Sequence, residues 1–197
     1  YTLNQLLYAS TSIYYIKRTN DKKTLKTIEE DGKNKSVIGQ LGTTVSKGFE
    51  FEMGINPLSN LSLSFGYTYT HATVSDIKKN EYLAVDENTG VQLAYVPRNM
   101  FYSSGSYKFT SPILKNLLVN YTISYTDKMY SDLSKTVTLP SHFITDLGAS
   151  YKLNNGIRIT GNLNNVFDKH YATNTYGRQI IPSIGRNYTI SLSYSLK

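Results

Sequence analysis

Three histidines, His71, His142 and His170, are the side chains best suited to metal binding or to proton transfer near neutral pH. They lie far apart in the sequence and show no metal-type spacing, and nucleophile-elbow, phosphate-loop and HExxH motifs are absent. Cysteine is absent too, which excludes disulfides, thiol nucleophiles and Cys-based zinc sites. The sequence therefore predicts that the protein is not an enzyme, has no metal site and carries no covalently bound cofactor.

Two carboxylates, Glu50 and Glu52, are the other candidates for chemistry, because paired carboxylates perform acid and base catalysis in glycosidases. Residues two apart on a strand share one face of it. A structural role on that face, with ion pairing to Arg158 or Lys108, is the favoured interpretation.

Strand-like alternation runs through the whole chain. In the last segment Tyr188, Ile190, Leu192 and Tyr194 alternate with small polar residues, which gives one apolar and one polar face. The same pattern recurs over residues 7–15, 49–56, 61–70, 101–109, 117–125, 143–153 and 157–167. We therefore expect an all-β fold of eight strands of about ten residues each, longer than is usual.

The predicted connections alternate in length. Residues 57–60, 110–115 and 154–156 form short turns, whereas about 28, 22, 11 and 14 residues follow Lys17, Ser75, Ser131 and Ala172. Tight turns alternating with long loops, between strands with a dyad repeat, are typical of an antiparallel transmembrane β-barrel. We expect no helix and no internal domain boundary.

The net charge of +7 comes from 21 Lys and Arg residues against 14 Asp and Glu residues. The densest run of cations, between Lys17 and Lys35, is mixed with acidic residues and reads as a solvated loop. It lacks the interleaved aromatic residues of a single-strand binding face, so nucleic-acid binding is not expected.

The mean hydropathy of −0.34 and the lack of an apolar run of about 20 residues fit a soluble protein at first sight. A soluble eight-stranded barrel of the lipocalin type is therefore an alternative. The strand and loop lengths disfavour it, as do tyrosines at strand ends on the apolar side, the place of an aromatic girdle at a membrane interface. These are Tyr15, Tyr67, Tyr69, Tyr107, Tyr125 and Tyr151.

The C-terminal third resembles the closing signature of TonB-dependent outer-membrane receptors, Asn-Leu-Phe-Asp-Lys-x-Tyr followed by Pro-Gly-Arg and a final strand. The matching residues are Asn165, Phe167, Asp168, Tyr171, Gly185 and Arg186. Val166 replaces the leucine, and two residues separate Pro182 from Gly185. Residues 47–52, 61–72 and 96–99 also look like that family, so the resemblance covers nearly the whole chain.

The resemblance implies a 22-stranded barrel with an N-terminal plug, in the bacterial outer membrane, that takes up a scarce ligand with energy from the TonB complex. This chain, residues 1–197, would supply the last eight strands. Its partners would then be the plug, the earlier strands, TonB through the missing N-terminal part, and outer-membrane lipid or lipopolysaccharide. Glu50, Glu52, Asp146 and Lys152 would face the plug. Since such chains usually end in an aromatic residue, we also expect one to follow Lys197.

The ligand implied is a ferric siderophore, with haem or cobalamin as alternatives within the family and a self-contained structural or adhesive barrel as an alternative outside it. Ferric catecholates are aromatic and anionic, so tyrosine rings and cations in the long loops suit them. The predicted contacts are Tyr82, Tyr95, Tyr130, Tyr176 and Arg178. Packing within the loops or the girdle is the alternative role for each tyrosine. No second feature of the sequence supports haem ligation by one of the histidines.

Overall fold

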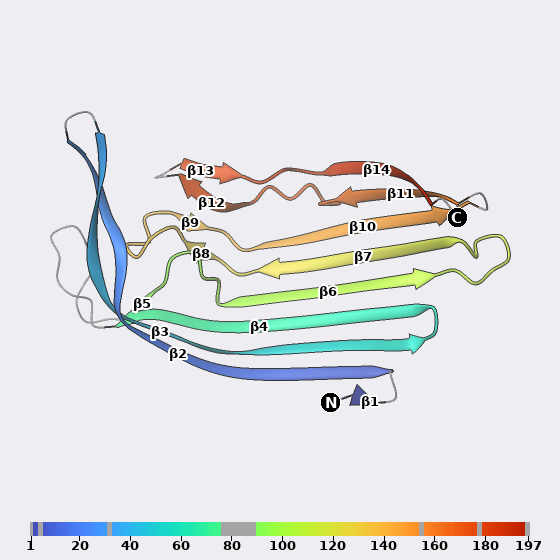
Figure 1. Ribbon diagram of the computed structural model, residues 1–197, viewed down its shortest axis with the longest axis horizontal. Coiled ribbons are helices and arrows are strands. Elements are labelled where there is room, and N and C mark those ends of the chain that lie inside the picture. Colours follow the sequence, from blue (N-terminus) through green and yellow to red (C-terminus); the bar gives the residue numbers. More distant parts are fainter. Residues whose placement is uncertain are drawn as a thin grey trace.

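The computed structural model describes residues 2–3, 6–30, 33–75, 90–153, 156–176 and 179–195. Antiparallel strands dominate, and no helix in this part of the chain is both long and apolar enough to cross a membrane. One ten-stranded sheet has the order β1-β2-β3-β4-β6-β7-β10-β11-β14, with β5 beside β4 (Figure 1). Its strands are β1 (Thr2–Leu3), β2 (Leu7–Glu30), β3 (Lys33–Leu58), β4 (Leu61–Ser75), β5 (Val91–Gln92), β6 (Asn99–Lys108), β7 (Leu117–Thr126), β10 (His142–Lys152), β11 (Ile157–Asn164) and β14 (Asn187–Tyr194). The all-β class and the eight expected strands are confirmed.

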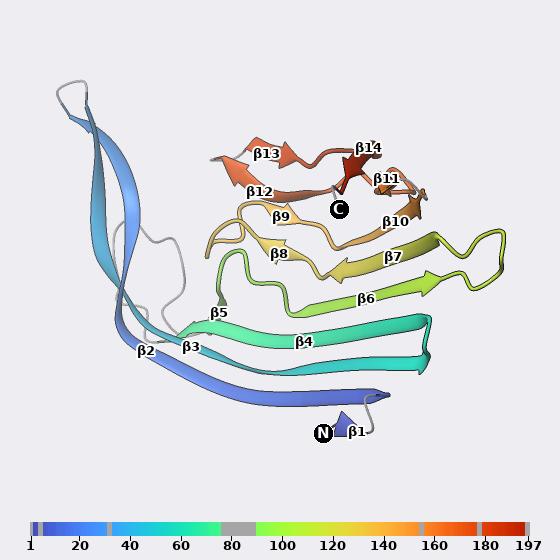
Figure 2. The ribbon, with the colours of Figure 1, turned by 45° about the vertical axis from the view of Figure 1, so that its right-hand side comes forward.

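The sheet is an open, curved wall, as the rotated view shows (Figure 2). Figure 1 places the tight turns and both chain ends at one end of the strands and the long connections at the other. We call these the turn end and the loop end. Two small hairpins lie at the loop end: β8 (Met129–Tyr130) with β9 (Thr138–Leu139), and β12 (Ala172–Tyr176) with β13 (Gln179–Pro182).

The two faces of the wall differ as the alternation predicts. On the wall, up to the register shifts of the projecting part of β2 and β3, the apolar face carries the odd-numbered residues of β2, β3, β4, β6, β7, β10 and β11 and the even-numbered residues of β14. Its side chains lie open, with Ile13 86% exposed and Tyr188 80% exposed. A row of directly paired aromatic residues crosses five strands on this face: Phe51, Tyr67, Phe101, Tyr125 and Phe143. This row matches an interfacial aromatic girdle near the loop end.

The girdle adjoins a polar zone. The Tyr67 hydroxyl donates to Asn99 Oδ1 over 2.7 Å, and Asn99 Nδ2 donates to Asp127 Oδ2 over 2.8 Å. Tyrosine suits such a boundary because its ring is apolar and its hydroxyl bonds with polar partners.

On the polar face, three tyrosines lie directly across from glycines of the neighbouring strand. Tyr8, Tyr14 and Tyr102 are the direct cross-strand partners of Gly54, Gly48 and Gly66. A Cβ on Gly66 would overlap the Tyr102 ring, with atoms 2.6 Å and 2.7 Å away. The missing side chain thus leaves the space that the facing ring fills, a form of aromatic rescue of glycine in a sheet.

Three expectations about the connections are wrong. Much of the charged segment after Lys17 is not a loop: β2 and β3 continue past the sheet as a projecting hairpin (Figure 1). β-branched residues such as Thr24, Ile28 and Ile38 favour strands there. The segment after Ala172 likewise forms a hairpin. Phe167 is not in the strand, because β11 ends at Asn164 and a turn follows.

Among the described residues, the clusters of buried apolar side chains lie at the loop end. Val74, Val91 and Leu133 form one cluster, and Met129, Leu139 and Ala172 form another. The wall itself has one layer, so its side chains face outward on both sides. The buried clusters fix the loops instead, and they position the candidate site.

Candidate functional site at the loop end

The two small hairpins form a platform over the loop end. Ala172 of β12 packs against Met129 of β8 and Leu139 of β9. His142, buried at the start of β10, stacks on the Tyr171 ring with centroids 4.4 Å apart. These contacts hold the β12–β13 hairpin against the β8–β9 hairpin, although the two are more than 30 residues apart in the sequence.

Two of the five predicted ligand residues, Tyr95 and Tyr130, are in contact on this platform, and a third, Tyr176, lies in its β12 strand. The Tyr95 amide donates to the Tyr130 carbonyl over 2.8 Å, and the Tyr95 hydroxyl shares a 2.6 Å hydrogen bond with the Thr175 hydroxyl. Tyr176, the next residue, is 80% exposed. The ammonium group of Lys135 lies 5.1 Å from the centre of the Tyr130 ring, within cation–π range. The predicted residues Tyr82 and Arg178 lie outside the described residues.

Asp132 stiffens the β8–β9 loop. Burial alone would raise the pKa of its carboxyl group. Hydrogen bonds from the Thr136 amide, the Ser131 hydroxyl and the Thr136 hydroxyl outweigh that effect and lower the pKa below its ordinary value. Asp132 therefore stays ionised and keeps the loop folded back beside Tyr130 and Lys135.

The family-type motif forms a turn built around Asn165, which is 4% exposed. Its side-chain oxygen accepts a hydrogen bond from the Lys169 amide at 2.8 Å, and its side-chain nitrogen donates to the Lys169 carbonyl at 3.0 Å. Its own amide donates to Asp146 over 2.7 Å, and the Val166 amide donates to the Thr145 carbonyl. Asp146 thus anchors this turn to β10, a role that the sequence did not indicate.

The same motif joins the two ends of the loop between β11 and β14. Asp168 accepts a 2.7 Å hydrogen bond from the Arg186 amide, and this bond, with the nearby Arg186 charge, lowers the pKa of the Asp168 carboxyl group. A Cβ at Gly185 would lie 2.9 Å from the Asp168 carboxylate, so a side chain there would crowd the bond. Phe167 is 73% exposed. The hydrogen bonds of the motif residues therefore hold the loop between β11 and β14 in shape.

The remaining candidates are the two glutamates of β3 and the other two histidines. Glu50 and Glu52 have exposed side chains on the polar face of β3, opposite Ser12 and Ser10 of β2. His71 is half-buried in β4, and His170 is exposed in the motif segment. Over the described ranges, no group of three or more His, Asp or Glu residues is placed to hold a metal ion.

Sequence reasoning missed Lys135, Asp132 and Thr175. Asp132-Leu-Ser-Lys135 carries turn-forming residues, so the loop could be anticipated. The Tyr95 contact with Thr175 could not be, because it joins residues 80 apart in the sequence.

Known proteins resemble this chain in sequence and structure. Residues 1–166 match the family model described as TonB dependent receptor-like, beta-barrel. The chain is 31% identical over 166 residues, 82% of its length, to the ferrioxamine B receptor of Salmonella typhimurium. It is also 31% identical over 154 residues, 77% of its length, to the ferric-pyoverdine BN7/BN8 receptor of Pseudomonas putida. The matched regions span only 22% and 17% of those receptors.

The crystal structure of the siderophore receptor PiuA from Acinetobacter baumannii superposes with a TM-score of 0.78 and 23% identity, over 98% of this chain and 26% of that one. At this identity the likeness shows the fold. Together with the family match over most of the sequence, the curved wall and the signature turn lead to one conclusion: the chain belongs to the β-barrel family of TonB-dependent receptors.

Proposed function

We propose that this chain forms part of the barrel wall and the outer loops of a bacterial outer-membrane receptor that takes up a ferric siderophore with energy from TonB. The observation that carries the proposal is the similarity along most of the chain to receptors named for ferrioxamine B and ferric pyoverdine. The proposal includes the rest of the receptor: a plug domain and earlier strands that pair with the sheet edges at β1 and β14.

The wall supports this assignment physically. Along the described part of β14, one edge pairs with β11 and the other has no strand beside it. An unpaired strand edge in lipid would leave several kcal/mol of unsatisfied hydrogen bonding per group. Further strands that close the barrel remove this cost. The apolar face would then meet lipid and the polar face would enclose the plug.

The loop platform supports an aromatic, anionic ligand class. Tyr95, Tyr130 and Tyr176 offer flat rings with hydroxyl groups, and Lys135 adds a positive charge against the Tyr130 ring. Such a surface suits a ferric catecholate or a similar iron chelate by stacking and charge attraction. The similarity to receptors named for ferric siderophores favours a siderophore over haem.

Growth on single iron sources tests the function. A strain that lacks the complete receptor should fail to grow on one ferric siderophore and should recover with the wild-type gene. In the complementing receptor, Tyr130→Ala should weaken siderophore binding roughly tenfold, as loss of a central aromatic contact does. Tyr194→Ala on the apolar face is the matched control and should bind as the wild type does. Unchanged growth of the deletion strain on every iron and cobalamin source would remove the siderophore assignment.

A further inference from the structure

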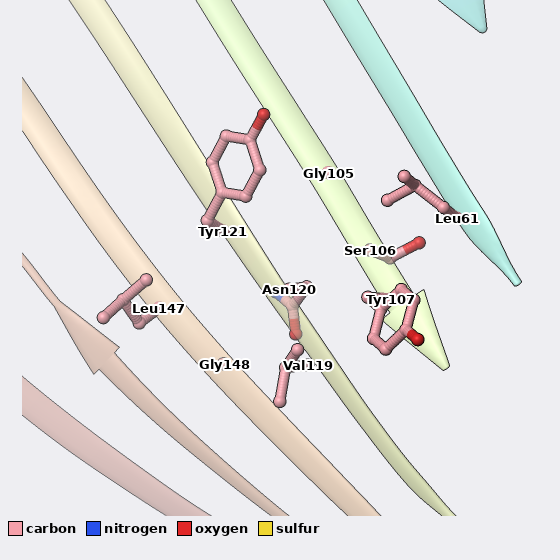
Figure 3. Close-up of a pocket in the computed structure, with 9 residues that line it drawn as sticks. All are labelled: Leu61, Gly105, Ser106, Tyr107, Val119, Asn120, Tyr121, Leu147 and Gly148. Atoms are coloured by element: carbon pink, nitrogen blue, oxygen red, sulfur yellow. The ribbon is translucent and has the colours of Figure 1, made fainter. Parts of the chain in front are cut away.

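The apolar face changes in character along its strands. Toward the turn end its side chains are mainly apolar, as around the hollow of about 310 Å³ that Leu61, Tyr107, Val119 and Leu147 border (Figure 3). At the loop end, beyond the aromatic girdle, the same face carries basic side chains. The face therefore runs from a surface suited to hydrocarbon to a surface suited to anionic headgroups.

The strand register brings three basic residues together on this face. Lys47 of β3 is the direct partner of Tyr15 of β2 and of His71 of β4. Lys17 follows Tyr15 by two residues on β2, so it lies on the same face, diagonal to Lys47 and about 7 Å from it. Lys17 and Lys47 are exposed, and His71 is half-buried. The two long lysine side chains can therefore reach one anion between them.

These cations lie directly beyond the aromatic boundary. The Phe49 ring packs against the rings of Tyr67 and Tyr69, with centroids 5.5 Å and 6.1 Å apart. Its cross-strand partner Ile13 is 86% exposed, which continues the apolar surface onto β2. Lys47 is two residues nearer the loop end than Phe49, about 7 Å along the strand. A lysine at this distance beyond an aromatic belt lies at headgroup depth.

Acidic residues are scarce around the two lysines. Residues 1–20, 32–49 and 53–75 contain no Asp or Glu, and Glu50 points to the opposite, polar face. Asp127 follows β7, three strands from Lys47, and its carboxylate accepts hydrogen bonds of 2.8 Å from Asn99 Nδ2 and from the Lys128 amide. The negative charge that balances Lys17 and Lys47 must therefore come from outside the described residues.

We propose that Lys17 and Lys47 bind a phosphate group of lipopolysaccharide, the phosphorylated glycolipid of the outer leaflet, whose acyl chains lie against Ile13 and Phe49. The proposal rests on the proposed function, because that function places the loop end at the outer surface of the outer membrane. The order along the strands, apolar, then aromatic, then cationic, matches the order of acyl chains and phosphates in the lipid. Lysine forms charge-assisted hydrogen bonds with phosphate, and His71 offers a ring N–H beside Lys47.

Native mass spectrometry of the complete, delipidated receptor tests the proposal. The receptor is titrated with bisphosphorylated lipid A and, separately, with the same lipid after both phosphates have been removed. The wild type should bind the phosphorylated form about 25-fold more tightly, with about fivefold from each lysine. The double substitution Lys17→Gln and Lys47→Gln should remove this preference and leave binding of the dephosphorylated lipid unchanged. Lys17→Arg with Lys47→Arg keeps both charges and should keep most of the preference.

A matched control separates this site from an effect of net charge. Lys108→Gln with Lys152→Gln also removes two exposed cations, but these lie on the polar face at the turn end. This variant should bind both lipids as the wild type does. Each variant is first tested for the heat-dependent gel mobility of a folded barrel. If the double variant of Lys17 and Lys47 does not fold, Lys47→Gln alone replaces it and should lose about fivefold in affinity for the phosphorylated lipid.

Equal affinity of the wild type for the two forms of lipid A, or an equal loss of affinity in the control variant, would overturn the proposal. So would a wild-type dimer that Lys17→Gln with Lys47→Gln converts to monomer, because a second copy of the receptor would then supply the negative charge. Lipid binding is read without siderophore, and siderophore growth is read without lipid titration. Failure of the siderophore assignment therefore leaves the lipid result standing, and the reverse also holds.

Discussion

The turn around Asn165 should control the opening of the loop between β11 and β14. Replacing Asn165 by Ala removes two side-chain hydrogen bonds to Lys169 at a buried position. Each is worth about 1 kcal/mol net. Asn165 also has a φ of 51°, and Ala in this left-handed region costs about 1 kcal/mol more than Gly. The local free energy of opening should fall by about 3 kcal/mol.

Hydrogen exchange measured by mass spectrometry reads this opening directly. With a tenfold change for each 1.4 kcal/mol, exchange of the Val166 amide should be roughly 100-fold faster in Asn165→Ala. Asn165→Gly loses the same hydrogen bonds but not the backbone preference, so its exchange should rise only about 25-fold. Lys169→Ala keeps the backbone groups that Asn165 bonds and is the matched control, with exchange close to that of the wild type.

The comparison of the two Asn165 variants decides the reasoning. Equal exchange in Asn165→Ala and Asn165→Gly would refute the contribution of the left-handed backbone. Wild-type exchange in both would refute the role of the side-chain hydrogen bonds, and it would show that the bond from the Asn165 amide to Asp146 is enough to hold the turn.

Two further predictions follow from the same loop and from the wall. The lowered pKa of Asp168 means that its contribution to loop closure is complete above the ordinary carboxyl value of 3.8 and is lost as the pH falls through the lowered folded-state pKa. After correction for intrinsic rates, hydrogen exchange of the Arg186 amide, which is bonded to Asp168, should therefore rise in acid in the wild type. The Asp168→Asn variant should show no such rise. A rise in both proteins would contradict the role of the Asp168 charge. On the wall, Gly66→Ala places a methyl group in the Tyr102 ring and should destabilise the barrel by about 1–3 kcal/mol, whereas Gly161→Ala meets open space and should be tolerated. The midpoint of the heat-dependent gel shift measures both, and adding Tyr102→Ala should relieve much of the Gly66→Ala defect; equal losses in Gly66→Ala and Gly161→Ala would contradict the pairing.

The wall could be predicted from the sequence because its strands and tight turns depend on residues that are close together in the sequence. Alternation decides the strand and its two faces within a few residues, as in Tyr188 to Tyr194. The turn Asn154-Asn155-Gly156 announces a tight connection by composition alone. Strand order then follows, since antiparallel neighbours joined by short turns must pair in sequence order.

The loops could be predicted only in part, because their structure depends on distant contacts. The weak alternation of residues 18–41 predicts a loop, but cross-strand pairing continues from the sheet and extends β2 and β3 outward as a hairpin. The platform needs the packing of Met129 on Ala172 and the bond between Tyr95 and Thr175. Tyrosine in a long loop could suggest a ligand contact, yet only the fold brings Tyr95 and Tyr130 together.

The abundance of tyrosine, 18 in 197 residues, follows from two demands that a one-layered wall makes at once. No second layer of secondary structure packs on the sheet, so the side chains of each face must themselves suit the surroundings of that face. On the apolar face Tyr67 and Tyr125 provide rings for a hydrocarbon boundary, and the Tyr67 hydroxyl bonds to the polar zone beyond it. On the polar face the rings of Tyr14 and Tyr102 lie against the facing glycines, and the Tyr14 hydroxyl bonds with Thr70 at 2.7 Å. A phenylalanine could fill the space of Tyr67 or Tyr14, but it would leave Asn99 or Thr70 without the hydrogen bond to the tyrosine hydroxyl. The residue type is therefore selected by the thinness of the wall, and the glycines opposite are selected by the rings.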